Sequence, residues 1–334
     1  MSTYRVDALT GQLRHSGYVL AGDQPTSVTV DPSAKFAYVT NANADTISAY
    51  TINASTGQLT SVGPPEATGD NPWSVAVDPS GKFAYVANWS SGDVTTYSID
   101  SVTGKLTKLP FVTLASVNPR SIAVDPSGKF AYVANGSGSV SAYTVNSATG
   151  ALSGPATVQA GTNPYAVTLH PSGKYAYVAN SGSNNISKYT IDSVSGALSN
   201  LITVQAGTTP YSVTLHASGK FAYVSNSGSG DVWVYDVDAA GDLAVKVSTQ
   251  TGPSPRFVTV DPSGRFAYVA HDSSNTVSRY AIDAANGTLT SLGPVTARYG
   301  PCAIAMTKGA TPIAYTPKFA YVAGANSDDV WAYD

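Results

Sequence analysis

The chain has few of the residues on which several classes of protein depend. Of its 334 residues, one is cysteine, two are methionine, and 12% are Asp, Glu, Lys or Arg. A single cysteine, Cys302, excludes an intrachain disulfide and a metal site built from several cysteines. No run of about 18 apolar residues occurs, and the first residues, MSTYRVDALTGQ, lack the apolar stretch of a secretory signal. We therefore expect a soluble protein, either cytoplasmic or exported with its signal removed.

The chain also lacks a large excess of either positive or negative charge. The formal net charge is −3, and Lys and Arg form no cluster along the chain. A protein that binds nucleic acid needs a concentrated positive surface to neutralise phosphates. We therefore expect neither a nucleic acid nor a membrane as partner. The expected partner is a small molecule, and the expected state is a monomer.

Gly, Ser, Thr, Asn and Tyr are abundant, which is typical of β-strands joined by tight turns. The strongest feature is a repeat, in which an aromatic residue followed by Ala-Tyr-Val occurs seven times. A proline precedes each copy, and successive prolines are 47, 47, 45, 46, 45 and 46 residues apart. The copies begin at Phe36, Phe83, Phe130, Tyr175, Phe221, Phe266 and Phe319, and the prolines are Pro25, Pro72, Pro119, Pro164, Pro210, Pro255 and Pro301.

Each repeat contains four strand-like runs separated by turns. In the unit from Ser74 to Leu109, the sequence Asp-Pro-Ser-Gly at 78–81 has the residues of a type I turn, and Ser-Val-Thr-Gly at 101–104 closes another hairpin. Four short antiparallel strands in a repeat of this length are typical of a β-propeller blade. The sequence predicts an all-β, seven-bladed propeller of four-stranded antiparallel blades.

The two ends of the chain complement each other. The last repeat stops at DDVWAYD (328–334), which supplies a third strand, and TGQLRHSG near the amino terminus matches the fourth strand of the next unit. We predict that residues 11–18 form a clasp strand that completes the last blade. Residues 1–334 would then form one propeller domain, with seven residues inserted within 306–318. One segment of a longer tandem array is the alternative.

Residues 38–41 read Tyr-Val-Thr-Asn, and six similar phrases follow. The chain thus resembles the YVTN-repeat β-propellers over essentially its whole length. It also resembles the broader lactonase family of seven-bladed propellers, which includes 6-phosphogluconolactonase-like and 3-carboxymuconate-cyclase-like enzymes. The resemblance implies the propeller fold and, through the broader family, lactonase-like or cycloisomerase-like chemistry.

Members of the lactonase family commonly carry Gly-Pro-Arg-His on one inner strand and Asn-Glu after the Tyr-Val phrase. In this chain the matching blade is SPRFVTVDPSGRFAYVAHDSSN, residues 254–275. Arg256 takes the place of the family's arginine. Phe257 stands in place of the histidine, and His271 and Asp272 replace the Asn-Glu pair. The resemblance therefore carries over Arg256 alone.

Positions that vary among the repeats are the best candidates for a site, because those that stay constant are explained by the fold. The residue after each anchor proline varies, and seven blades would arrange these residues as a ring at the channel mouth. Two arginines can bind a carboxylate or phosphate, and aromatic walls can pack against a ligand. We predict that Arg120, Trp73, Tyr165 and Tyr211 bind a small anion together with Arg256. The seven residues are Thr26, Trp73, Arg120, Tyr165, Tyr211, Arg256 and Cys302.

Three further residues are candidates for proton transfer. Antiparallel pairing brings His271 close to Arg256, and histidine moves protons near neutral pH. Asp272 is the candidate to orient the imidazole. Glu66, which is the chain's one glutamate, lies on the loop that leads to Trp73 and is a weaker candidate. In five other repeats the position of His271 holds asparagine: Asn41, Asn88, Asn135, Asn180 and Asn226.

Two functions remain open at this stage. The first is a lactonase or cycloisomerase for a small anionic substrate such as a sugar-acid lactone, in which Arg256, His271 and Asp272 are catalytic. The second is a non-catalytic binding or structural module of a surface or secreted protein. No histidine or carboxylate pair has the spacing of a metal site, so we expect no cofactor, although calcium held by loop oxygens stays an alternative.

Overall fold

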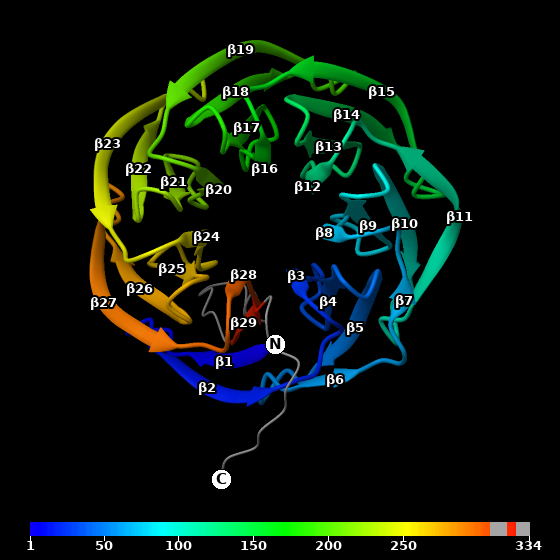
Figure 1. The fold of residues 1–334 in the computed structure, drawn as a ribbon, viewed down its shortest axis with the longest axis horizontal. Coiled ribbons are helices and arrows are strands. Elements are labelled where there is room, and N and C mark those ends of the chain that lie inside the picture. The colour runs from blue at the N-terminus through cyan, green and yellow to red at the C-terminus, as the bar shows by residue number, and fades with distance from the viewer. Residues whose placement is uncertain (308–318, 325–334) are drawn as a thin grey trace.

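A computed structural model of the chain describes residues 1–307 and 319–324. These residues form 29 strands arranged as seven antiparallel sheets around a central axis, with no helix among them (Figure 1). The prediction of a seven-bladed propeller is confirmed. No helix in the described ranges is long and apolar enough to cross a membrane.

Each sheet has four strand positions from the channel to the rim. The second blade is typical, with the order β8-β9-β10-β11 from inside to outside. The innermost strands are β3 (Pro25–Val30), β8 (Pro72–Val77), β12 (Pro119–Val124), β16 (Pro164–Leu169), β20 (Pro210–Leu215), β24 (Pro255–Val260) and β28 (Pro301–Met306). The second strands are β4 (Phe36–Asn41), β9 (Phe83–Asn88), β13 (Phe130–Asn135), β17 (Tyr175–Asn180), β21 (Phe221–Asn226), β25 (Phe266–His271) and β29 (Phe319–Gly324).

The outer half of each blade contains the remaining strands. The third strands are β5 (Thr46–Ile52), β10 (Asp93–Ile99), β14 (Ser139–Val145), β18 (Asn185–Ile191), β22 (Asp231–Val237), β26 (Thr276–Ile282) and β1 (Ser2–Val6). The outermost strands are β11 (Leu106–Leu114), β15 (Leu152–Gln159), β19 (Leu198–Gln205), β23 (Leu243–Gln250), β27 (Leu289–Thr296) and β2 (Leu13–Tyr18). In the first blade this place is shared by two short strands, β6 (Leu59–Ser61) and β7 (Glu66–Ala67), which both pair with β5.

The turn between the first two strands is organised by a buried carboxylate. Asp78 Oδ1 accepts hydrogen bonds from the amides of Lys82 (2.8 Å) and Phe83 (2.7 Å), and Oδ2 accepts from Ser80. Gly81 has φ +70°, in the left-handed region that glycine adopts at little cost. The turn therefore sends the chain directly back into β9, whose six residues are all buried.

Aromatic residues of the second and third strands join each blade to both of its neighbours. Phe83 lies against Gly150 of the next blade, where a Cβ atom would overlap the ring. The hydroxyl of Tyr177 donates to the carbonyl of Gly241 in the next blade at 2.7 Å, and that of Tyr189 donates to the carbonyl of Gln159 in the previous blade at 2.5 Å. Equivalent contacts recur in most blades because the repeat recurs, although the buried hydroxyls of Tyr85 and Tyr321 have no hydrogen-bond partner among the described residues.

The amino-terminal segment completes the last blade. Its strand order is β2-β1-β29-β28, so the two blue strands lie beside the two orange-red ones in Figure 1. Strand β2 confirms the predicted clasp. The segment also supplies the third strand, a place that sequence analysis gives to residues 328–334. Tyr4 of β1 makes the third-strand contact, donating to the carbonyl of Thr296 in the sixth blade at 3.0 Å.

Two expectations fall on parts of the chain that lie outside the described residues. One is the third strand at 328–334. The other is most of the insertion within 306–318, of which the structure describes only Met306, at the end of β28, and Thr307.

One turn departs from the pattern and provides a stability test. Ala34 has φ +58° at the place where five other repeats have glycine, such as Gly128 with φ +72°. A side chain in this conformation costs roughly 1 kcal/mol. We expect Ala34→Gly to increase the free energy of unfolding by about that amount in chemical denaturation.

The reverse change, Gly128→Ala, is the matched control. A Cβ atom at Gly128 would lie 3.6 Å from Pro79 Cδ, so the alanine fits and only the backbone conformation penalises it. It is expected to lower stability by a similar amount. Equal stability of all three proteins would contradict this account of the turn.

Candidate functional site

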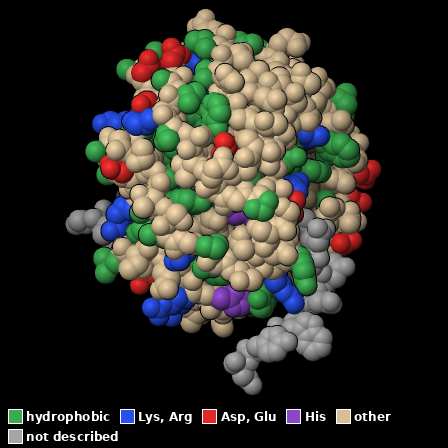
Figure 2. All heavy atoms as spheres, turned by 60° about the vertical axis from the view of Figure 1, so that its left-hand side comes forward, with side chains coloured by type: hydrophobic (Ala, Val, Ile, Leu, Met, Phe, Trp, Pro, Cys, Tyr) green, Lys and Arg blue, Asp and Glu red, His purple; other side chains and the backbone are tan. Residues whose placement is uncertain are grey.

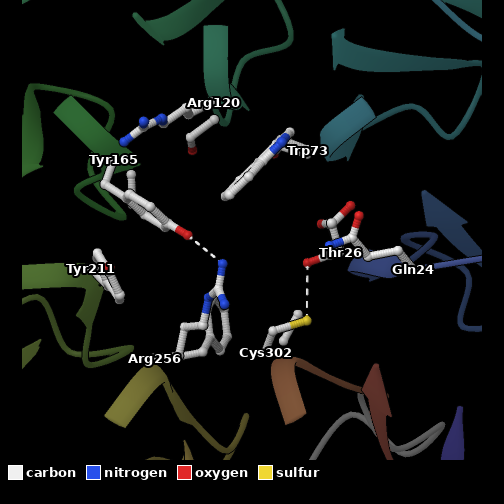
Figure 3. A pocket seen from close by; sticks show the side chains of 14 residues that line it. Gln24, Thr26, Trp73, Arg120, Tyr165, Tyr211, Arg256 and Cys302 are labelled. Atoms are coloured by element: carbon white, nitrogen blue, oxygen red, sulfur yellow. Dashed lines mark hydrogen bonds between the residues drawn. The ribbon is translucent and has the colours of Figure 1, made fainter. Parts of the chain in front are cut away.

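The residues that follow the seven anchor prolines converge on one cavity at the channel mouth. Thr26, Trp73, Arg120, Tyr165, Tyr211, Arg256 and Cys302 all line it (Figure 3). The residue before each proline has a positive φ, as at Asn71 (+56°) and Asn118 (+59°). In the first six blades its carbonyl accepts a hydrogen bond from the residue after the second strand. This shared loop conformation gives the seven side chains equivalent starting points at the mouth.

The cavity is open to solvent and has a volume of about 680 Å³ when that open part is counted. Beneath the ring, most of the cavity is lined by small residues that lie two places after each anchor proline. They are Ser27, Ser74, Ser121, Ala166 and Ala303. Phe257 takes the same place in the sixth blade. Its ring is therefore the one bulky apolar side chain at this level among the lining residues.

Arg256 is held on all sides. Its Nη1 donates to Asp272 Oδ2 at 2.9 Å, and its Nη2 donates to the Tyr165 hydroxyl at 2.8 Å. Its guanidinium also lies 5.7 Å from the ring centroids of Trp73 and Tyr211. In Figure 3 this side chain extends from the sixth blade toward the centre of the cavity. Arg256 is therefore fixed in position and its charge is partly neutralised.

Arg120 has a different environment. Its guanidinium carbon lies 5.2 Å from the ring centroid of Tyr165 and 5.8 Å from that of Trp73. Within the described residues it makes no ion pair, and its buried Nε has no hydrogen-bond acceptor. Burial lowers the pKa of Arg120, but arginine keeps its proton in proteins. The cavity wall therefore carries an uncompensated positive charge.

Tyr165 lies between the two arginines. Its ring contacts Arg120, and its hydroxyl oxygen accepts from Arg256, which leaves the hydroxyl hydrogen available for a ligand. Burial raises the pKa of this hydroxyl, so it stays protonated at neutral pH. The ring stacks on Tyr211 with centroids 4.2 Å apart and an interplanar angle of 25°. The aromatic wall is thus rigid and presents a polar donor at its tip.

The side chains that the first and seventh blades contribute to the cavity wall are small. Thr26 and Cys302 are its walls, and the Cys302 thiol approaches the carbonyl oxygens of Pro25 (3.4 Å) and Thr26 (3.5 Å). Burial raises the pKa of Cys302 to about 11, so the group is a neutral thiol and a poor nucleophile at neutral pH. No Asp, Glu or His is among the residues that line the cavity.

His271 does not line the cavity. Strand pairing places His271 opposite Pro255, the neighbour of Arg256, but the residue is 1% exposed and its ring lies near Gly252, with Nδ1 3.2 Å from the carbonyl oxygen of Pro253. Its Nε2 has no partner among the described residues. Asp272 does not orient this ring, because its carboxylate binds Arg256 instead. The two neighbours point in different directions, since successive side chains on an extended chain alternate.

The asparagines at equivalent positions show what this buried place requires. Asn180 Nδ2 donates to Asn185 Oδ1 (2.8 Å) and to Ser187 Oγ (2.9 Å), which joins the second strand to the third. His271 fills the same space without making those bonds. The position is therefore a packing position of the blade.

Glu66 also lies away from the cavity. It belongs to β7 at the rim of the ring, where it pairs with Ile47. In the described part of the chain, no group of three or more His, Cys, Asp or Glu residues could hold a metal ion.

Charged side chains of both signs are interspersed over the face in Figure 2.

A family profile described as a lactonase seven-bladed β-propeller matches residues 6–118, 64–163, 113–215 and 207–305. The chain belongs to this family. Similar solved structures include a candidate 6-phosphogluconolactonase from Bacteroides uniformis, with a TM-score of 0.81 and 21% identity over 90% of this chain and 93% of that one. No curated protein matches the chain significantly.

Two further structures show how widely the fold is used. A periplasmic gluconolactonase from Pseudomonas aeruginosa has a TM-score of 0.79 and 21% identity, over 96% of this chain and 94% of that one. Hydrazine synthase from Kuenenia stuttgartiensis has a TM-score of 0.71 and 19% identity, over 92% and 96%. Likeness at this identity concerns the fold alone, so the site of this lactonase-family propeller is argued from its own residues.

Sequence reasoning identified the ring but missed three features of this lactonase-family propeller. The contact between Tyr165 and Arg256 joins residues 91 positions apart, which no local pattern reveals. Phe257 was noted as a departure from the family and not as a cavity residue. Gln24 lines the cavity from the position before an anchor proline, where the repeated loop was the available signal.

The burial of His271 leads to a pH prediction. Burial lowers its pKa below the usual 6.5, so the folded protein favours the neutral ring while the unfolded chain binds a proton below about pH 6.5. The neutral ring makes its full contribution to the free energy of unfolding above pH 6.5, and this contribution declines as the pH falls toward the pKa of His271 in the folded protein. His271→Asn removes the effect.

We therefore expect denaturant titrations at pH 7.5 and 5.5 to show a smaller loss of stability on acidification for His271→Asn than for the wild type. Every other titratable group is common to the two proteins, so its contribution cancels in the comparison. Identical losses would show that the His271 ring is solvated in the folded protein.

Proposed function

We propose that this protein is a lactonase that opens a small sugar-acid lactone bearing a carboxylate or phosphate, bound at the channel mouth. The observation that carries the proposal is Arg120, a guanidinium that has no carboxylate partner within residues 1–307 and 319–324, on a cavity with no acidic residue among the described ones that line it. A half-buried cation of this kind favours an anionic ligand, which would supply the missing charge and hydrogen bonds. Membership of the lactonase family supports the reaction class.

The surrounding residues suit the rest of such a substrate. Trp73 and Tyr211 offer apolar faces against which a sugar ring packs. Tyr165 and Arg256 provide donors for the lactone carbonyl oxygen, on which negative charge develops during attack by water. Because Asp272 and the aromatic rings already fix Arg256, these donors need little reorganisation when the substrate binds.

The hydrolytic step needs an acceptor for one proton. The oxygen of water adds to the carbonyl carbon, its proton passes to a base, the ring C–O bond breaks, and the proton returns to the departing alkoxide. Asp272 does not line the cavity, but it is the carboxylate bound to the lining residue Arg256, and within the described residues no other side chain donates to it. We assign the base role to Asp272 and give His271 no part in the transfer.

The binding half of the proposal is tested with Arg120→Gln. Calorimetric titration with 6-phosphogluconate and gluconate should give a dissociation constant raised roughly 10- to 100-fold, since a hydrogen bond to a charged group is worth about 1.5–3 kcal/mol. Lys108→Gln, which removes a positive charge on the outer strand β11, is the control and should bind as the wild type does. Equal affinity of both variants would refute an anion site at Arg120.

The catalytic half is tested with Asp272→Asn. Lactone opening, followed by acid release, should fall in kcat by about 100-fold or more, which is the usual contribution of a general base. His271→Asn should keep its kcat, because His271 does not line the cavity. The variant should also fold, since five other blades already hold asparagine at that position. The reverse pattern would return the proton transfer to the histidine.

A non-catalytic binding module is the second candidate. It is favoured by the absence of any Asp, Glu or His among the cavity-lining residues. In that case the anions would bind as described, and Arg120→Gln would weaken their binding. Wild-type protein would then not accelerate the opening of glucono- or 6-phosphoglucono-lactone.

A further inference from the structure

The two arginines of the channel mouth occupy equivalent positions in the third and sixth blades, but the residue beside each of them differs. Arg120 and Arg256 both follow an anchor proline. In each blade the residue after the second strand donates its amide hydrogen to the carbonyl of the residue before that proline, at 3.2 Å for Asp272 and 2.7 Å for Gly136. Gly136 therefore has the place in the third blade that Asp272 has in the sixth.

These two positions form an ion pair in the sixth blade and only half of one in the third. Asp272 Oδ2 accepts from Arg256 Nη1 at 2.9 Å, and the side chain of Asp272 is 31% exposed. Gly136 has no side chain to offer Arg120. A Cβ atom built on Gly136 would lie 3.4 Å from Arg120 Nε, which has no acceptor among the described residues. The third blade thus keeps the cation of the pair and omits the anion.

The backbone does not require glycine at position 136. Its φ lies outside the left-handed region that favours glycine, and a Cβ atom would lie 3.3 Å from Asn118 Cβ, a contact that a small shift relieves. Every other repeat has a side chain at this position. In sequence order the seven residues are Ala42, Trp89, Gly136, Ser181, Ser227, Asp272 and Ala325.

The charge at the mouth matches an anion with a single negative charge. Among the described residues that line the cavity, only Arg120 and Arg256 are charged, and Asp272 compensates Arg256. One positive charge is left over. A carboxylate carries one negative charge at neutral pH, whereas a phosphate monoester carries about 1.5 to 2. A bound carboxylate would balance the site, and a phosphate would bring further charge without a cation to pair with it.

We propose that Arg120 and the space beside Gly136 form a carboxylate subsite at the rim of the cavity, where a ligand carboxylate pairs with Arg120 as Asp272 pairs with Arg256. This inference rests on the proposed function and narrows its substrate from a carboxylate or phosphate to a carboxylate. Arg120 is half-buried and lines the cavity, so a ligand can reach its outer nitrogens.

The substrate class is then the monolactone of a sugar diacid, in which one carboxyl group is closed into the ring ester and the other is free. Tyr165 contacts both guanidinium groups, one with its ring and the other with its hydroxyl (Figure 3). The free carboxylate and the lactone carbonyl of one small molecule can therefore reach Arg120 and Arg256 together.

Calorimetric titration of the wild-type protein tests the choice of anion. Glucuronate and glucose 6-phosphate have the same ring, with a carboxylate or a phosphate at the same end. Glucuronate should bind roughly tenfold more tightly, because the additional charge of the phosphate would be desolvated without a partner. Equal or tighter binding of glucose 6-phosphate would overturn the carboxylate subsite, and this comparison does not depend on the folding of a variant.

Gly136→Asp tests the position of the subsite. The new carboxylate would pair with Arg120 in place of the ligand, so the dissociation constant of glucuronate should rise roughly 10- to 100-fold. Ser227→Asp is the matched control, because it adds the same charge at the same loop position of the fifth blade, beside Tyr211, and it should bind as the wild type does. An equal loss in both variants would show general repulsion and overturn the proposal.

The double variant Gly136→Asp, Arg120→Gln shows whether the two residues act at one place. It should bind glucuronate no more weakly than the weaker of the two single variants, since each change removes the same interaction. Fully additive losses would refute a shared subsite.

The single variants also separate this inference from the proposed function. If Arg120→Gln weakens binding and Gly136→Asp does not, the anion site remains and the subsite beside Gly136 is refuted. If neither variant weakens binding, both proposals fail. If both weaken binding but the wild type opens neither glucarolactone nor 6-phosphogluconolactone, the carboxylate subsite is supported and only the lactonase activity is refuted.

Discussion

The structure depends on contacts that hold each blade against its two neighbours. A blade is a thin sheet whose two faces are both apolar, so it is stable only when both are covered. The second-strand tyrosine reaches forward to a glycine carbonyl, as Tyr132 does to Gly196, and the third-strand tyrosine reaches back, as Tyr235 does to Gln205. Closing the ring with the amino-terminal strands extends these contacts to the last blade, where Tyr268 donates to the carbonyl of Gly11.

This arrangement separates stability from function. The conserved part of each repeat, from the turn aspartate to the buried Tyr-Val, is used for packing, while the residue after the anchor proline points into the channel mouth. Seven equivalent loops therefore present to one cavity seven side chains whose identity is not determined by the packing of the blades. Exchanging them changes the chemistry of the cavity without changing the sheets, which fits a fold that also occurs in a gluconolactonase and in hydrazine synthase.

The electrostatics of the site follow from two arginines with different partners. Asp272 and Tyr165 bind Arg256, which becomes a fixed donor, whereas Arg120 is surrounded by aromatic rings and keeps an unbalanced charge. The sequence predicts only that both bind the same small anion. They differ because the contacts of each depend on which blades bring side chains across the channel.

The sequence by itself determined the number of blades, their strand order and the ring of variable residues, because a repeat of regular length that cannot bury both faces alone must stack on copies of itself. It also determined the clasp at Leu13–Tyr18. Tertiary structure alone decided that β1 joins the last blade, that His271 is buried beside Gly252 while Asp272 reaches Arg256, and that Tyr165 separates the arginines. Those outcomes depend on distances across the channel and on the direction of each side chain, which a linear pattern does not contain.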